Sequence, residues 1–266
     1  MLRKTFIIIL VIIFMLPVFW SVISSFKSIS EIYNYPPTVF PSKISFEGYL
    51  RVFKDYNFMT YLNNTLFVAV IATVITVLVC IMTGYGLAKG SFPGKQLLTN
   101  AMLTTLFITA QIMMVPLFIV IKKLELVNSL WGLIIPAVYT PTGTFTAIQY
   151  MKDIPDELME SAKIDGANEW QIFWKIIMPL SKPLVAALAI FSFTWRWNDF
   201  ILPLIVINDS KLYTIQLALS SLQGQYSIPW NAIMAFSTLA IVPTLVIFLL
   251  FQKLFMRGLM AGGLKY

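Results

Sequence analysis

The residues that could do chemistry are few, and most of them lie in one stretch. Residues 153–179, DIPDELMESAKIDGANEWQIFWKIIMP, hold six of the twelve acidic residues in the chain. No histidine is present, and the single cysteine, Cys80, lies in an apolar run where we expect it to face lipid or a neighbouring helix. A metal cluster or a disulfide framework cannot be built from these residue types. We therefore expect no catalytic, cofactor-binding or metal-binding residues.

A second polar segment, KGSFPGK at residues 89–95, superficially suggests a phosphate-binding loop. Its Gly90 and Gly94 are one residue too close together for that motif, and Gln96 stands where Ser or Thr would hold magnesium. The spacing therefore predicts that this chain has no ATP site.

The acidic stretch carries the signals of two short helices. Asp153, ahead of an Ile-Pro-Asp-Glu sequence, suits the unpaired N–H groups at a helix start. Gly166 ends that helix, and Asn168 with Gln171 resembles a capping box that begins a second one. Pro179 then interrupts the second helix. The pattern predicts a helix–turn–helix elbow. Its small and charged residues could enter a groove on a soluble partner, and a plain amphipathic surface loop would carry the same polarity.

The composition of the whole chain excludes a soluble globular domain. Hydrophobic residues make up 58% of the 266 residues, charged residues 12%, and the mean hydropathy is +0.80. Soluble domains usually have about 25% charged residues. The net charge of +7 is typical of basic loops near anionic lipid, so we expect a lipid bilayer as partner and no nucleic acid.

Six apolar stretches are long enough to cross the membrane, because about 20 helical residues span about 30 Å of hydrocarbon. They lie near residues 6–26, 61–84, 98–121, 129–150, 183–205 and 231–251. We therefore predict an all-α, polytopic membrane protein with six transmembrane helices, residues 1–266 forming a single transmembrane domain. The first stretch lacks a small-residue cleavage site after it and is expected to remain attached.

Breaks are expected in the third and fourth of these stretches. They contain Pro116, Pro136, Pro141 and Gly143, which free backbone groups that neighbouring helices must satisfy. Such kinks are either hinges or packing irregularities without a moving part, and the sequence leaves both open.

The distribution of basic residues predicts the orientation. With the N-terminus inside, inner segments hold eleven Lys and Arg residues and outer segments seven. Both termini and the elbow are then cytoplasmic. The first connector is external, and Pro36, Pro37 and Pro41 forbid a regular helix in it.

Arg196 and Asp199 are one turn apart on the fifth apolar stretch. Charged residues inside a membrane are usually functional, but Trp195 and Trp197 could mark the interface and place both charges near water. Contact with a bound substrate and local structural pairing are both open.

The elbow resembles a family signature. Permeases of binding-protein-dependent ABC importers have Glu-Ala-Ala, three residues, Gly, nine residues, Ile, one residue and Leu-Pro in this loop. The matching residues here are Glu160, Ser161, Ala162, Gly166, Ile176, Met178 and Pro179, with Ser and Met as the two substitutions. The sequences Ile164–Ala167, Trp197–Phe200 and the Ala-Gly-Gly-Leu-Lys ending are similar to the carbohydrate-uptake branch, in particular to the maltose-permease subunit with six spans.

The resemblance implies a type I ABC importer permease fold in the cell (inner) membrane. Residues 151–180 would form a cytoplasmic coupling loop seated in a cleft of the ATP-hydrolysing subunit. Glu160 and Asp165 would be polar contacts, Ser161 and Ala162 the close-packed face, and Gly166 the turn. Ile176, Met178 and Pro179 complete the signature, with Pro179 as the break before the fifth span. A C-terminal tail would also contact the ATPase subunits, through Ala261, Gly262, Gly263, Leu264 and Lys265.

The partners implied by the resemblance are a second permease subunit, two ATP-binding cassette subunits and an extracytoplasmic solute-binding protein. ATP and Mg would be bound by those partners, and this chain would not be an enzyme. The cargo would be a sugar or oligosaccharide. Alternatives are the same machine with another polar cargo such as a glycerol-phosphate ester, an ion-coupled secondary transporter, and a membrane scaffold that recruits a soluble enzyme. Ion coupling usually needs buried carboxylates, and only Asp199 is a candidate.

Overall fold

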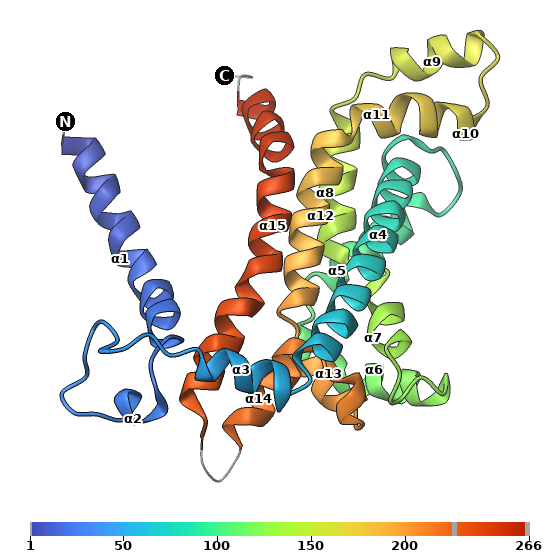
Figure 1. Ribbon diagram of the computed structural model, residues 1–266. Helices are drawn as coiled ribbons and strands as arrows, with labels where there is room; N and C mark the ends of the chain where they lie inside the picture. Colours follow the sequence, from blue (N-terminus) through green and yellow to red (C-terminus); the bar gives the residue numbers. More distant parts are fainter. Residues whose placement is uncertain (1, 225–227, 264–266) are drawn as a thin grey trace. The chain divides into compact units, whose positions relative to one another are not determined.

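The computed structural model describes the backbone of residues 2–224 and 228–263 and the side chains of residues 4–224 and 228–252. Every regular element within those ranges is a helix, which confirms the all-α prediction (Figure 1). The chain divides into two compact units. The first comprises residues 1–64 and 210–245, and the second comprises residues 65–209 and 246–266.

The first unit contains the long first helix, several short helices and the starts of two further long helices. Its elements are α1 (Leu2–Ser24), α2 (Ile29–Ile32), α3 (Glu47–Lys54), the start of α4 (Phe58–Lys89), η3 (Ser210–Leu212), α14 (Ile215–Gln223) and the start of α15 (Trp230–Gly263). The Phe58 ring packs edge-on against Phe236 with 5.0 Å between ring centroids. The connector predicted to lack regular helix contains α2 and α3, and α3 forms because it lies beyond the last proline, Pro41.

A carboxylate closes the loop between α2 and α3. Glu31 accepts hydrogen bonds from the Ser42 backbone N–H at 2.7 Å, the Ser42 hydroxyl at 2.9 Å and the Thr38 hydroxyl at 3.2 Å. These bonds, led by the Ser42 backbone N–H, lower the pKa of Glu31 because they favour the ionised form. The Lys27 ammonium donates to the Thr38 carbonyl and lies 4.7 Å from the centre of the Trp20 ring.

The second unit holds the larger core. Its elements are the rest of α4, α5 (Lys95–Thr105), α6 (Ala110–Lys123), α7 (Trp131–Ile134), η1 (Ile135–Ala137), α8 (Pro141–Lys152), α9 (Glu157–Ile164), α10 (Glu169–Ile172), η2 (Phe173–Ile177), α11 (Met178–Leu180), α12 (Lys182–Trp197), α13 (Ile201–Val206) and the end of α15. Cys80 and Ile81 of α4, Met151 of α8 and Leu184 of α12 are buried in one cluster. Cys80 is fully buried, as expected for a small side chain facing a neighbouring helix.

The six predicted spans correspond to continuous helices in only some cases. Three helices of the described residues are long and apolar enough to cross a membrane, at Lys4–Ser24, Phe58–Lys89 and Trp230–Gln252. Two pairs of shorter helices, each pair joined at a bend, reach that length together. Lys95–Thr105 and Ala110–Lys123 meet at 110°, and Glu169–Leu180 and Lys182–Trp197 meet at 75°.

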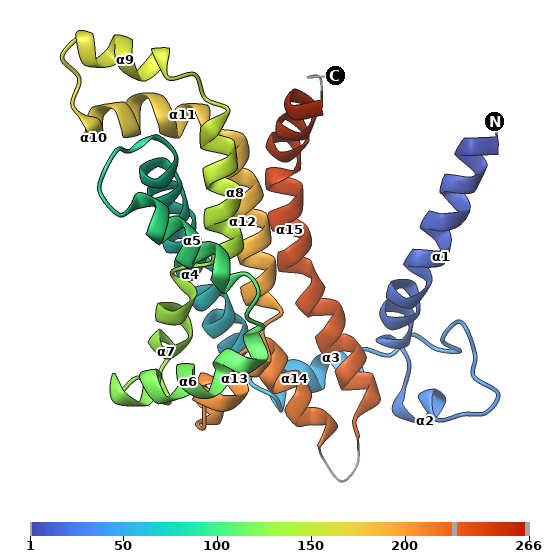
Figure 2. The ribbon, with the colours of Figure 1, turned by 180° about the vertical axis from the view of Figure 1, so that it is seen from behind.

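The third predicted span bends at a different point from its proline. Pro116 lies inside α6, whereas the bend falls at residues 106–109 between α5 and α6, as Figure 2 shows. Backbone bonds that reach only three residues back tighten the end of α5 there: the Leu106 N–H donates to the Leu103 carbonyl, and the Phe107 N–H donates to the Thr104 carbonyl. The break in this span therefore does not come from Pro116.

The fourth predicted span is broken into α7, η1 and α8. Pro136 is the second residue of the 3-10 turn η1 and Pro141 is the first residue of α8, so both rings sit where a helix start tolerates them. The carbonyl of Ala137 at the break accepts a hydrogen bond from the Thr76 hydroxyl at 2.6 Å and from Arg196 Nη2 at 3.4 Å. Side chains of α4 and α12 thus satisfy a backbone group that the break leaves free, as the sequence predicts.

Candidate functional site

The elbow is a pair of antiparallel helical arms beyond the ends of α8 and α12 (Figure 1). The first arm is α9, and the second is the continuous run of α10, η2 and α11. The prediction that Asp153 caps the first arm is wrong, because its N–H bonds to the Tyr150 carbonyl at 3.2 Å and so closes the end of α8. The first arm begins later, at Glu157, with Asp156 in the capping position.

The turn between the arms is closed by backbone hydrogen bonds. Gly166 has φ +82°, a left-handed conformation that glycine adopts without steric cost. The N–H of Gly166 donates to the Lys163 carbonyl at 3.0 Å, and that of Ala167 donates to the Ala162 carbonyl at 2.9 Å. These two bonds form a Schellman motif, which confirms that Gly166 ends the first arm.

A capping box begins the second arm. Asn168 Oδ1 accepts the Gln171 backbone N–H at 2.9 Å, and Gln171 Oε1 accepts the Asn168 backbone N–H at 2.9 Å. Each side chain thus satisfies an N–H group that the start of a helix leaves free. The predicted capping box is confirmed, and it fixes where the chain turns into α10.

The inner face of the elbow belongs to the core of the second unit. Its buried residues are Met159, Ala162, Ile172, Phe173 and Ile177. Ala162 follows Met159 by three residues, so both point inward on α9. Ala162 is therefore close-packed within the permease itself. Of the predicted pair, Ser161 alone is exposed, and its hydroxyl donates to the Leu158 carbonyl at 3.1 Å.

The outer face of α9 carries the remaining residues predicted to contact a partner. Glu160 and Asp165 are exposed there. Sequence reasoning missed two apolar residues beside them, Leu158, which is 42% exposed, and Ile164, which is 87% exposed. Helical spacing could have found both, since each lies three residues from Ser161. We call Leu158, Glu160, Ser161, Ile164 and Asp165 the outer face of α9; it offers apolar surface flanked by carboxylates.

The second arm ends differently from the prediction. Ile176 and Met178 are half-buried against the core, whereas Pro179 is exposed. The helix does not stop before Pro179. The five residues Phe173–Ile177 form a π-helix, and α11 carries Pro179 to the bend at Ser181. A wider turn relieves the clash between a proline ring and the carbonyl four residues earlier.

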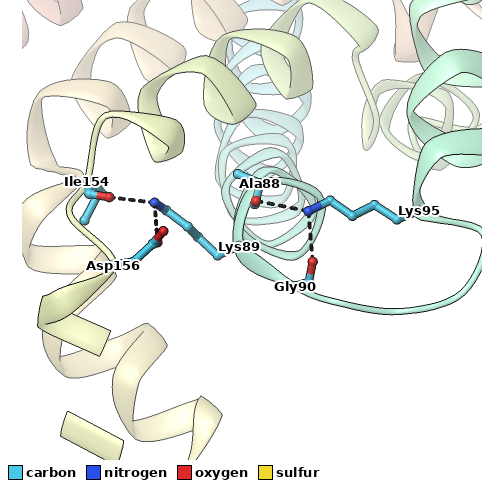
Figure 3. A network of polar contacts seen from close by, with 6 residues as sticks. All are labelled: Ala88, Lys89, Gly90, Lys95, Ile154 and Asp156. Atoms are coloured by element: carbon cyan, nitrogen blue, oxygen red, sulfur yellow. Dashed lines mark hydrogen bonds and ion pairs between the residues drawn. The ribbon is translucent and has the colours of Figure 1, made fainter. Parts of the chain in front are cut away.

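Polar contacts attach the elbow to the end of α4. Lys89 Nζ donates to the Ile154 carbonyl at 2.6 Å and to Asp156 Oδ1 at 2.7 Å (Figure 3). The Tyr85 hydroxyl donates to Glu169 Oε2 at 2.9 Å. Glu169 Oε1 also forms an ion pair of 2.7 Å with Lys163, which joins the two arms.

Arg196 and Asp199 form hydrogen bonds with separate backbone groups. Among the ion pairs of the described residues, none joins these two side chains. Arg196 donates to the Ala137 carbonyl, and Asp199 Oδ1 accepts the Leu202 N–H at 3.4 Å at the start of α13. Helix α12 ends between them, at Trp197, so they do not lie on the single helix that the sequence suggests.

The predicted tail contact falls mostly outside what the structure describes. Ala261, Gly262 and Gly263 lie in the last turn of α15, where only the backbone is described. Leu264 and Lys265 lie outside the described residues. Among the side chains that are described, no three His, Cys, Asp or Glu residues gather as a metal site.

Comparison with known proteins identifies the family. Residues 81–260, which include the whole elbow, match the model of the binding-protein-dependent transport system inner membrane component. The chain belongs to this family. It is therefore a multi-pass permease of the membrane, a transporter subunit rather than an enzyme.

Relatives of the permease cover nearly its whole length. The arabinooligosaccharides transport system permease protein AraQ of Halalkalibacterium halodurans is 33% identical over 92% of this chain and 88% of its own length. The diacetylchitobiose uptake system permease protein NgcG of Streptomyces coelicolor is 32% identical over 91% and 81%. A solved bacterial ABC transporter involved in the import of the acidic polysaccharide alginate has a chain of the same fold, with a TM-score of 0.83, 22% identity and coverage of 95% and 94%.

Proposed function

We propose that this permease is one of two membrane subunits of an ATP-driven importer that passes a sugar or oligosaccharide from an extracytoplasmic binding protein into the cytoplasm. The observation that carries the proposal is the outer face of α9, where Leu158, Ser161 and Ile164 are exposed on a helix whose other face is packed into the core. Apolar surface flanked by carboxylates suits a groove on a soluble partner.

The partner at this face is an ATP-binding cassette subunit, with residues 151–180 as the coupling loop; two such subunits bind ATP and Mg for the complex. Glu160 and Asp165 set the register of docking, while Leu158 and Ile164 supply apolar contact. ATP favours the closed pair of subunits, and the docked elbow makes an outward-facing pore part of that state. The tail residues 261–265 make a second contact with the same subunits.

Six spans in a single transmembrane domain, with both termini in the cytoplasm, are part of this proposal. The excess of eleven basic residues over seven supports it. In a Cys80→Ser background, Ile44→Cys and Ser210→Cys should react with a membrane-impermeant maleimide added to intact cells, and Ser161→Cys should react only after the cells are opened. All three positions are exposed. Labelling of position 161 in intact cells would show that the elbow lies outside the cell, where it could not contact the ATPase subunits.

The sugar cargo is supported by the relatives, whose names refer to arabinooligosaccharides and diacetylchitobiose. A third relative, from Agrobacterium fabrum, is named for sulfoquinovosyl glycerol and is 30% identical over 94% of this chain and 88% of its own length. The test is uptake into proteoliposomes that hold the complex purified through a tag on this permease, with binding protein outside and ATP inside. We expect ATP-dependent uptake of an oligosaccharide. Uptake that needs no ATP and stops with an ionophore would contradict the proposal and favour ion coupling.

Arg196 and Asp199 have a structural role in this proposal. Each holds a backbone group beside a helix break, the Ala137 carbonyl in one case and the Leu202 N–H in the other. We infer that the two side chains position these breaks and do not contact the cargo.

A further inference from the structure

Helix α4 contacts the elbow although the chain does not connect them directly. The helices α5, α6, α7 and α8, with η1, lie between α4 and α9 in the sequence. Tyr85 and Lys89 are nevertheless one helical turn apart on α4, so both side chains lie on one face. Each of them bonds to a different part of the elbow.

Lys89 holds the entry to the first arm. Its ammonium bonds to the Ile154 carbonyl and the Asp156 carboxylate, immediately before α9 begins (Figure 3). The Lys89 side chain is 10% exposed, whereas that of Asp156 is 69% exposed. A buried ammonium is costly without partners, so these two contacts fix the position of Lys89 and of the segment it bonds.

Tyr85 holds the second arm. Its hydroxyl donates to Glu169, the first residue of α10, and its ring lies 5.8 Å from that of Phe173. Glu169 in turn pairs with Lys163 on α9. The two α4 residues therefore bond to both arms of the elbow, and Glu169 connects the arms to each other.

We propose that Tyr85 and Lys89 form a brace that makes α4 move with the elbow, so that a displacement of the elbow by the ATPase subunit is passed to α4 as well as to α8 and α12. This inference rests on the proposed coupling function. Apolar packing alone permits packed helices to slide past one another. Directed hydrogen bonds to two points of the elbow oppose that sliding.

Two neighbouring residues offer matched controls. Lys95 Nζ bonds to the carbonyls of Ala88 at 3.1 Å and Gly90 at 2.9 Å, so it closes the end of α4 without bonding to the elbow (Figure 3). The Tyr150 hydroxyl donates to the Leu180 carbonyl at 2.9 Å and joins α8 to the second arm, not to α4. Lys95→Met and Tyr150→Phe thus remove the same chemical groups from the same region.

The experiment compares Tyr85→Phe, Lys89→Met and the double variant with the two controls in proteoliposomes holding the whole complex. Three quantities are measured: the amount of ATPase subunit that co-purifies, the rate of ATP hydrolysis and the solute taken up per ATP. We expect the double variant to retain the ATPase subunit and to hydrolyse ATP, while solute per ATP falls at least about fivefold, the lower end for coupling between distant sites. Lys89→Arg should keep the ratio of the unaltered permease, because a guanidinium can donate to the same two oxygens.

If the double variant took up as much solute per ATP as the unaltered permease, the proposed brace would be refuted. Loss of the ATPase subunit from the double variant would also overturn it, because the two residues would then only support the shape of the elbow. Tyr85→Phe keeps its ring against Phe173 and tests the proposal even where Lys89→Met fails to accumulate. Failure of the coupling function itself is distinguishable, because the unaltered permease would then retain no ATPase subunit.

Discussion

The elbow and the broken span at residues 135–141 both interrupt helices, but different groups close them. The elbow turn is closed by residues close together in the chain, through the backbone bonds at Gly166, the cap of Asn168 and Gln171, and the ion pair of Lys163 with Glu169. The broken span is closed by side chains from distant helices, since Thr76 and Arg196 donate to the Ala137 carbonyl. The turn of the elbow is therefore encoded locally, and the shape of the break depends on tertiary packing.

The largest expected effect tests local closure of the elbow. Gly166→Val should abolish co-purification of the ATPase subunit while the permease still inserts, because a β-branched residue in a left-handed turn is strained by about 1–3 kcal/mol. A Cβ at Gly166 would meet nothing within 4 Å, so the strain is in the backbone alone.

Gly94→Val is the matched control. Gly94 has φ +84° and equally open surroundings, but it lies in the loop before α5. The control should carry similar strain and keep the ATPase subunit. Recovery of that subunit with Gly166→Val at wild-type yield would refute the role of the turn.

At the broken span a partial loss of stability is expected, and not the complete loss of a partner subunit. Arg196→Gln should lower the stability of the detergent-solubilised permease by about 1.5–3 kcal/mol, the usual range for a hydrogen bond to a charged group. Because Arg196 and Asp199 bond to separate backbone groups, adding Asp199→Asn should not restore stability. Thermal unfolding of the two single variants and the double variant measures this. Recovery in the double variant would show that the two side chains act as a pair.

The smallest effect is expected in the loop between α2 and α3, which the charged side chain of Glu31 closes. Glu31 has a lowered pKa in the folded loop, so its contribution to stability is present above its unfolded pKa and is lost as the pH falls through the folded pKa. Acidification should therefore increase the opening of residues 33–46, measured by amide hydrogen exchange corrected for its intrinsic pH dependence. Glu31→Gln should open that loop at neutral pH and remove the pH dependence. If loop opening in Glu31→Gln depended on pH as it does in the unaltered permease, the pH dependence would come from another titratable group.

The sequence predicted some of the features that depend on adjacent residues, although it placed the cap of the first arm at Asp153 instead of Asp156. The turn at Gly166 and the capping box at Asn168 are examples, because each is completed within a few positions. The contacts of Lys89 and Tyr85 could not be predicted, since their partners lie 65 to 84 residues away. The inward orientation of Ala162 also depends on which face of α9 the core covers.

Cross-linking from the exposed end of α9 tests the coupling claim most directly. Ile164→Cys in a Cys80→Ser background would carry a maleimide-linked photoreactive group, and the purified complex would be illuminated with and without ATP. Ile164 is 87% exposed, and Ile44, at 70%, supplies the control position in the loop before α3. We predict that position 164 cross-links to the ATP-binding subunit and that position 44 does not. An intact complex in which position 164 captures no ATP-binding subunit would contradict the account.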